Sequence, residues 1–150
     1  MNDIDDLINL DIEALECLYN SPIQSPSPTG RYEGVFLCRL DEPGNRRPLY
    51  WGSKAFEFVP FGIDFDTCCW YFFHQKLQSG KFRTETASSR WRDSRVIKLH
   101  YDVSHLPVFV KNVLYDEVKP LSKDLCLALG GFNQATGNGD QFFFALKRIK

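Results

Sequence analysis

A histidine, a nearby carboxylate and a lysine are the first side chains of this sequence that suggest chemistry. His100 and Asp102 are two residues apart, so on a β-strand both would lie on one face, where Asp102 could orient His100 as a general base. Lys98 shares that face, which favours the alternative of an ordinary polar face exposed to water. The three histidines of the chain lack metal-ligand spacing. We therefore assign no catalytic residue and expect neither a metal nor a cofactor.

The cysteines indicate the compartment more clearly than they indicate chemistry. There are five, an odd number; two are adjacent and no pair has the CxxC spacing, which argues against both a disulfide framework and a structural zinc site. Reduced thiols suit a reducing compartment, so we expect a cytoplasmic protein. Nothing near Cys68 and Cys69 in the sequence would lower a thiol pKa, and buried, inert cysteines are the favoured interpretation.

A group of arginines surrounds a tryptophan and is the one basic and aromatic cluster of the sequence. Arg83, Arg90, Arg92 and Arg95 with Trp91 could bind an acidic ligand head group or RNA, whereas the alternative is a polar strand face and turn. The 18 basic and 19 acidic residues give a net charge of −1. This balance argues against a nucleic-acid partner and favours the alternative.

The elements that must position these side chains are mainly β-strands. Residues 3–19 predict one short amphipathic helix, and a Ser/Pro-rich connector follows up to residue 29. From residue 30 the apolar period changes to two, with turn signals every 8–12 residues or so. We therefore predict an N-terminal segment over 1–29 and a barrel domain over 30–150, an antiparallel up-and-down barrel of about eight strands. The expected strands are 31–40, 50–58, 69–75, 82–91, 95–102, 113–118, 125–129 and 141–149, with a loop over 60–64.

Aromatic side chains are abundant, with 13 Phe, 6 Tyr and 3 Trp. A barrel of about eight strands is just wide enough either to hold one small ligand or to be filled by its own side chains. Both alternatives fit this composition. If a cavity exists, the residues expected to line it and bind a ligand are Trp51, Phe56, Tyr71, Phe73, His74, Arg90 and Tyr101.

The order of several short motifs resembles the lipocalin-like (calycin) barrels. Gly30-Arg31-Tyr32-Glu33-Gly34 follows the predicted helix, and Arg148 lies in the last predicted strand. The chain is more closely similar to an uncharacterised bacterial family named for its Gly-x-Trp-x-Gly motif, through Trp51-Gly52-Ser53-Lys54-Ala55-Phe56, Tyr101-Asp102 and the ending Phe144-Ala145-Leu146-Lys147-Arg148. Tyr32 stands where both groups have Trp. The resemblance implies that Tyr32 plugs the barrel base and that Arg148 covers its ring; it implies a fold and no activity.

From these observations we predict a protein that binds a small hydrophobic or amphipathic molecule. The alternative is an isomerase, cyclase or lyase acting on an apolar substrate in the same cavity, which requires an ionisable group inside, with His100, Asp102 and Glu117 as candidates. A purely structural role, with a possible homodimer, also stays open. No apolar run reaches the length of about 18 residues that a membrane helix needs.

Overall fold

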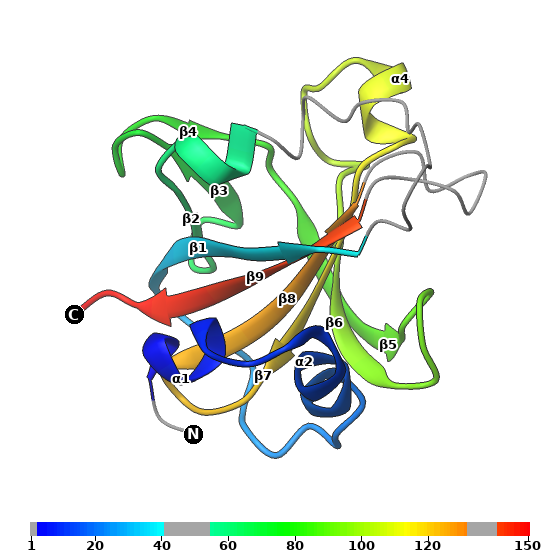
Figure 1. Cartoon of the computed structure of the whole chain (residues 1–150). Helices are drawn as coiled ribbons and strands as arrows, with labels where there is room; N and C mark the ends of the chain where they lie inside the picture. Colours follow the sequence, from blue (N-terminus) through cyan, green and yellow to red (C-terminus); the bar gives the residue numbers. More distant parts are fainter. Residues whose placement is uncertain (1–2, 41–54, 132–140) are drawn as a thin grey trace.

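The chain folds into one antiparallel sheet that curls into a half-barrel (Figure 1). The computed structural model describes residues 3–40, 55–131 and 141–150. The prediction of a mainly β, up-and-down barrel with short N-terminal helical structure is confirmed, and the described residues form nine strands where about eight were expected. They are β1 Arg31–Arg39, β2 Phe61–Asp64, β3 Cys69–Phe72, β4 Gln78–Ser79, β5 Arg83–Ser88, β6 Arg95–His100, β7 Tyr115–Pro120, β8 Leu125–Gly131 and β9 Gln141–Arg148.

Two meanders meet at the centre of the sheet. The strand order is β4-β3-β2-β1-β9-β8-β7-β6-β5, so every neighbouring pair is consecutive along the chain except β1 and β9. The β1–β9 pair is antiparallel, with Tyr32 opposite Arg148 and Gly34 opposite Leu146. Strands β4 and β5 are the two ends of the sheet.

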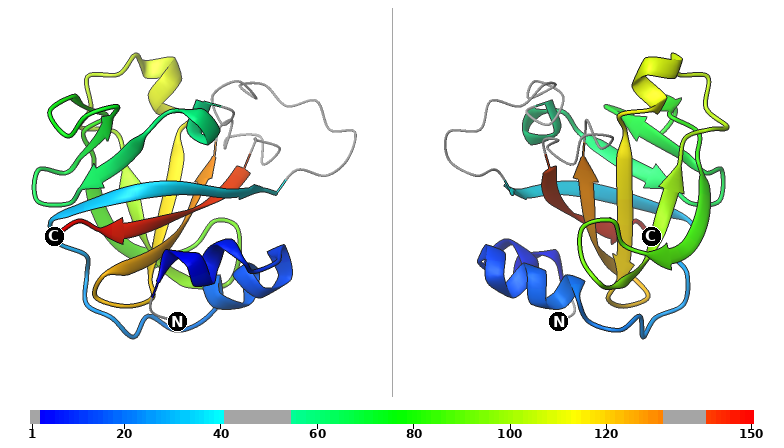
Figure 2. Two further views of the ribbon diagram at one scale, coloured as in Figure 1. Left: turned by 60° about the vertical axis from the view of Figure 1, so that its left-hand side comes forward. Right: turned by 90° about the vertical axis from the view of Figure 1, so that its right-hand side faces the viewer.

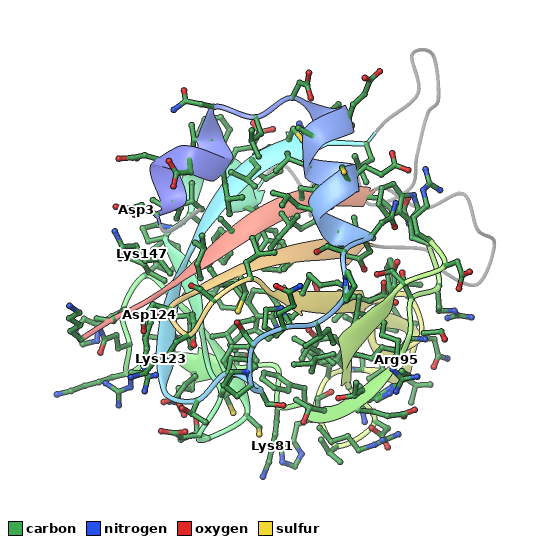
Figure 3. All side chains as sticks on the ribbon, turned by 90° about the horizontal axis from the view of Figure 1, so that it is seen from below. Asp3, Lys81, Arg95, Lys123, Asp124 and Lys147 are labelled. Atoms are coloured by element: carbon green, nitrogen blue, oxygen red, sulfur yellow. The ribbon has the colours of Figure 1, made fainter. Side chains whose placement is uncertain are left out.

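The period of two in β9 separates the inner face of the curl from the outer face. Phe142, Phe144 and Leu146 belong to the inner core, whereas Phe143 and Ala145 belong to the outer core. Two helices, α1 Ile4–Ile8 and α2 Ile12–Tyr19, lie across the outer face (Figures 2 and 3). A third helix, α4 Val108–Lys111, lies at the opposite end of the molecule (Figure 2). Both faces of the central strands are buried, since every residue of β8 and residues 142–146 of β9 are buried.

The prediction of one helix over residues 3–19 is wrong in its continuity. Asp3 caps α1 with a capping box, and Asp11 starts α2 by accepting a hydrogen bond from the Ala14 backbone N–H. A second capping residue inside the segment ends one helix and begins another. The Asp3 carboxylate also accepts a hydrogen bond from Lys147 Nζ at 2.7 Å, which ties α1 to β9 (Figure 3).

Two strand predictions are also corrected. The expected loop over residues 60–64 contains strand β2. Gly62 lies in this strand because the Tyr71 ring of the next strand packs against it, and a Cβ atom on residue 62 would lie 2.1 Å from that ring. The described end of the expected strand 50–58 is helical over residues 55–58, and residues 50–54 lie outside the described residues. Glycine and proline in Pro60-Phe61-Gly62 signalled a turn, but close packing of two strands explains the glycine.

Tyr32 is buried in the inner core, but Arg148 does not cover its ring as the resemblance implied. The Tyr32 ring is buried, packs edge-on against Phe65, and its hydroxyl donates to the Lys123 carbonyl at 2.8 Å. The Arg148 guanidinium lies against Gly30, whose φ of +80° suits glycine. Across the described residues, the cation–π pairs are formed by Arg39 and Arg92.

Candidate functional site

An apolar pocket of about 240 Å³ opens between the two limbs of the half-barrel. One wall comes from β3 and the short helical segment over 55–58, the other from β7, β9 and α4 with the residues that flank it. Most of the lining is aromatic or aliphatic, as is usual for small-molecule sites. The lining residues are Phe56, Trp70, Phe72, Ser79, Gly80, Tyr101, Leu106, Val110, Leu114, Asp116, Gly131 and Phe142.

A chain of hydrogen bonds crosses the interior beside this pocket. Trp70 Nε1 donates to the Tyr101 hydroxyl at 2.6 Å, and that hydroxyl donates to Oδ2 of Asp116. Trp70 lies on β3, Tyr101 follows β6, and Asp116 lies on β7, so the chain joins the two limbs of the curl. All three side chains line the pocket. These hydrogen bonds therefore hold the Asp116 carboxyl group in place at the surface of an apolar pocket.

Burial makes Asp116 an unusual carboxyl group. Loss of hydration raises its pKa to about 8; the hydrogen bond from Tyr101 opposes that rise and the charge of Glu117 adds to it. Gly130 on the neighbouring strand leaves the room that the carboxyl needs, because a Cβ there would lie 2.9 Å from Oδ1 of Asp116 and 2.7 Å from the Phe142 ring. Burial therefore favours the neutral form of Asp116, which can donate a proton, while its ionised form can accept one.

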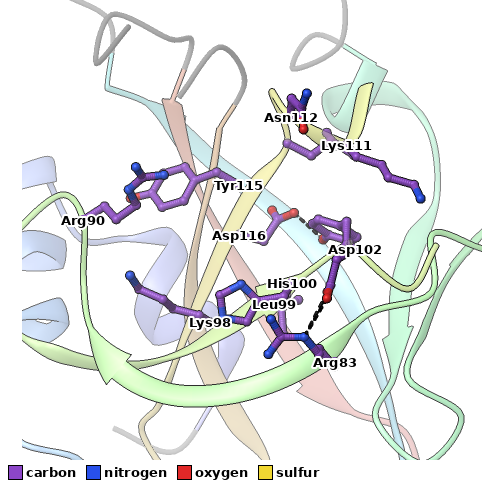
Figure 4. Close-up of a pocket in the computed structure, with 12 residues that line it drawn as sticks. Arg83, Arg90, Lys98, Leu99, His100, Asp102, Lys111, Asn112, Tyr115 and Asp116 are labelled. Carbon is purple, nitrogen blue, oxygen red and sulfur yellow. Dashed lines mark hydrogen bonds and ion pairs between the residues drawn. The ribbon is translucent and has the colours of Figure 1, made fainter. Parts of the chain in front are cut away.

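A second, polar hollow of about 570 Å³ adjoins the apolar pocket (Figure 4). The two share Tyr101, Leu114 and Asp116, so Asp116 lies at their common boundary. The other lining residues of the polar hollow are mostly basic or polar: Arg83, Arg90, Lys98, Leu99, His100, Asp102, Lys111, Asn112 and Tyr115.

The seven predicted ligand-binding residues are divided among three places. Phe56 and Tyr101 line the apolar pocket, and Arg90 lines the polar hollow. Tyr71, Phe73 and His74 line a different hollow beside β1 and β2. Trp51 lies outside the described residues. The structure thus brings Phe56 and Tyr101 together and places Tyr71, Phe73 and His74 elsewhere.

Backbone geometry explains the separation of the β3 residues. Alternation along the strand directs Trp70 inward and Tyr71 outward, where the Tyr71 hydroxyl donates to the Tyr32 carbonyl at 2.8 Å. The strand ends at Phe72, and Phe73 has a φ of +64° and is 69% exposed. The expected strand 69–75, covered on both faces, is therefore too long at its end.

The three acid–base candidates do not lie in the apolar pocket. His100 Nε2 lies 3.0 Å from Glu85 Oε2, whereas Asp102 accepts from Arg83 Nε at 2.9 Å. Asp102 does not orient His100, because each of the two side chains pairs with a residue of β5 instead. Glu117 is buried on the outer face, where it accepts hydrogen bonds from Tyr19 and from Ser89 at 2.5 Å. None of the three therefore supplies an ionisable group to the apolar pocket.

Of the cysteines expected to be buried, Cys126 is buried, whereas Cys68 and Cys69 are partly exposed. Burial raises the pKa of Cys126 to about 12 and raises that of Cys38 above its usual value. Arg92 lies over the Trp91 ring at 3.9 Å and pairs with Glu16 at 2.5 Å, so it anchors α2. Within the described ranges, no three His, Cys, Asp or Glu side chains are grouped to hold a metal ion.

The sequence analysis missed Asp116, although a signal was present. The run Leu114-Tyr115-Asp116-Glu117-Val118 alternates between the two faces of β7, so one of two adjacent acids had to point into the curl. Leu114 and Val118 pack in the inner core, and Asp116 shares their face. An acid between two inward apolar residues is a stronger indication of a site than exposed His100 and Asp102.

Comparisons with known proteins support the fold alone. No family model matches the chain, and no curated protein matches it. A crystal structure of a protein from Thermomonospora curvata is similar, with a TM-score of 0.53 and 16% sequence identity over 94% of this chain and 89% of that chain. The barrel fold is supported, whereas neither family suggested by the motifs is matched. No described helix has the length and apolar character needed to cross a membrane.

Proposed function

We propose that this protein binds a small hydrophobic or amphipathic molecule in the apolar pocket of the half-barrel. The observation that carries the proposal is an aromatic-lined pocket whose boundary holds a hydrogen-bonded carboxyl group, Asp116. A few fixed polar groups in an apolar lining are the usual composition of a ligand site. The pocket volume of about 240 Å³ is below the range of about 300–1,000 Å³ typical for drug-sized ligands, which favours a small apolar group.

A titration with an uncharged fluorescent probe, N-phenyl-1-naphthylamine, tests this function. We expect saturable binding to the native protein and at least about tenfold weaker binding to Val110→Trp, because the indole fills the pocket. Val108→Trp is the matched control, since Val108 lies on the same helix α4, is 70% exposed and does not line the pocket. Equal binding by both variants, or no saturable binding, would reject the proposed function.

A second candidate is an isomerase, cyclase or lyase that uses Asp116 as its general acid or base. The specific support is a buried carboxyl group with a pKa near 8 at the pocket surface, held by Tyr101. A group whose pKa lies near the working pH is suited to proton transfer. In such a step the ionised carboxyl would take a proton from carbon next to a substrate carbonyl and return it from the neutral acid.

The exchange of hydrogen for deuterium at the carbon next to the carbonyl of 1-tetralone tests this second candidate. The reaction is run in D₂O and followed by proton NMR. We expect the native protein to accelerate exchange at the carbon next to the carbonyl, within the range of about 10²–10⁴-fold that general acid–base catalysis contributes. Asp116→Asn should lose the acceleration while still binding N-phenyl-1-naphthylamine. If the native protein binds the probe but does not accelerate exchange, the enzyme candidate is rejected and the binding function is retained.

A further inference from the structure

The polar hollow beside the apolar pocket collects positive charge from separate parts of the chain. Arg83 lies on β5, Arg90 follows that strand, Lys98 lies on β6 and Lys111 ends α4. The whole chain has a net charge of −1, so this accumulation is local. Figure 4 shows Arg90 and Lys98 on one side of Asp116 and Lys111 on the other.

Three of these cations have no acidic partner among the described residues. Arg83 pairs with Asp102 at 2.9 Å, which neutralises both groups. By contrast, the side chains of Arg90, Lys98 and Lys111 form none of the described ion pairs. Lys98 and Lys111 are half-buried, so their charges are less screened by water than those of exposed lysines.

The acidic groups in and beside the hollow form no described ion pair with these three cations. Glu85 and Glu117 lie opposite Lys98 in the register of β5 and β7, but Glu85 pairs with His100, and Glu117 accepts hydrogen bonds from Tyr19 and Ser89. Asp102 is already used by Arg83. Asp116 faces the hollow from β7, and its burial favours the neutral acid. An incoming anion would therefore meet unpaired cations and a neutral carboxyl that can donate a hydrogen bond.

We propose that the ligand of this site is an amphipathic anion, with its apolar part in the pocket and a carboxylate, sulfonate or phosphate head group in the polar hollow. The inference rests on the proposed binding function and specifies its ligand class. The two cavities share Tyr101, Leu114 and Asp116, so one molecule can occupy both. The small size of the apolar pocket also requires a larger ligand to extend beyond it.

A matched pair of probes tests the head group. 1-Anilinonaphthalene-8-sulfonate has the ring framework of N-phenyl-1-naphthylamine with an added sulfonate. We expect the sulfonate probe to bind the native protein about threefold to tenfold more tightly, and to lose that advantage as salt is raised. Equal affinity of the two probes would overturn the anionic head group while leaving the proposed function intact. If neither probe binds, both proposals fail.

Charge variants locate the head group. Lys98→Gln combined with Lys111→Gln should remove most of the difference between the two probes and leave binding of the uncharged probe unchanged. Lys76→Gln combined with Lys123→Gln is the control, because it removes the same charge from exposed lysines outside both cavities. Equal weakening by the two double variants, with circular dichroism unchanged, would mean that general charge attraction binds the sulfonate and would overturn the proposal.

Competition distinguishes an amphipathic anion from a free anion. Octanoate should displace the sulfonate probe, whereas 1-octanol and inorganic phosphate at the same concentration should displace it less. Displacement by phosphate as strong as that by octanoate would assign the hollow to a free anion and overturn the amphipathic ligand.

Discussion

Asp116 combines three properties that rarely occur together in one side chain. It is buried, it is held by a hydrogen bond from Tyr101, and it touches two cavities of opposite character. Placing a carboxyl in such surroundings costs stability when the group ionises, because the charge loses its hydration. A buried carboxyl group that lowers the stability of the fold when it ionises is typical of a functional site.

The free energy of unfolding should therefore depend on pH in a way that Asp116 dominates. The Asp116 pKa is about 8 in the folded state and about 3.9 in the unfolded chain. The unfolded state releases this proton first, so stability is complete below about pH 4 and falls up to about pH 8, by a few kcal/mol at most. In urea unfolding from pH 5 to 8, Asp116→Asn should flatten this decline.

Asp102→Asn is the matched control for that pH dependence. Asp102 is exposed, and its hydrogen bond from Arg83 lowers its pKa. The group is ionised in both states above pH 5, so its removal should leave the decline unchanged. A steep decline that persists in Asp116→Asn would show that another group causes it.

At the scale of elements, α2 is held to the outer face by both apolar and polar contacts. Leu15 is buried in the outer core, and the Tyr19 hydroxyl donates to Glu117 on β7. Lys119, also on β7, donates to the Ser21 carbonyl at 2.6 Å and to Ser94 Oγ at 2.8 Å. Helix α2 and the residues after it thus cover Glu117 and Lys119 on the outer face of β7. Asp116, on the same strand, faces the site on the inner face.

Removing the apolar contact of α2 should destabilise the whole fold. We expect Leu15→Ala to lower the free energy of unfolding by about 2–5 kcal/mol, since it leaves a cavity under the helix. Ile12→Ala is the control on the same helix, because Ile12 is 45% exposed, and its cost should be within about 1 kcal/mol. Chemical unfolding followed by circular dichroism measures both; similar values for the two variants would contradict the assigned packing.

The elements that the sequence predicted best are those with an unbroken period. In β6, Ile97 and Leu99 alternate with Lys98 and His100, and the strand was assigned within two residues. Strand β9 is instead a continuous apolar run from Phe142 to Leu146, and its predicted end was one residue too long. Tertiary packing decided the others. The glycine in β2 accommodates a ring from β3, and Asp11 divides the helix, neither of which periodicity alone reveals.

The candidate site was predicted only in part, for a related reason. Of the seven residues expected to bind a ligand, Phe56 and Tyr101 line the apolar pocket, although residues 55–58 are helical. Phe73 and His74 were placed by extending a strand past the residue where it ends. The neighbourhood of Asp116 depends on strands from both limbs of the curl, and pairing across that distance cannot be read from local spacing.

The whole molecule is an open curl, and its openness locates the site. Strands β4 and β5 are the two ends of the sheet, and the apolar pocket lies between the limbs that carry them. Trp70 on one limb donates to Tyr101 on the other, and Tyr101 donates to Asp116, so hydrogen bonds across the interior join the two limbs. The residues of the site therefore also hold the two limbs of the sheet together. Ligand binding there should stabilise the native protein by mass action.

The central position of β9 has a consequence for synthesis on the ribosome. Strand β1 emerges early, but β9, its partner on one side, emerges after all the other strands. Until then, two separate meanders, β1 to β4 and β5 to β8, each have an edge that is central in the finished sheet and is open to wrong partners. The nascent chain must keep the edges of β1 and β8 from pairing with other molecules until one late strand joins the two halves.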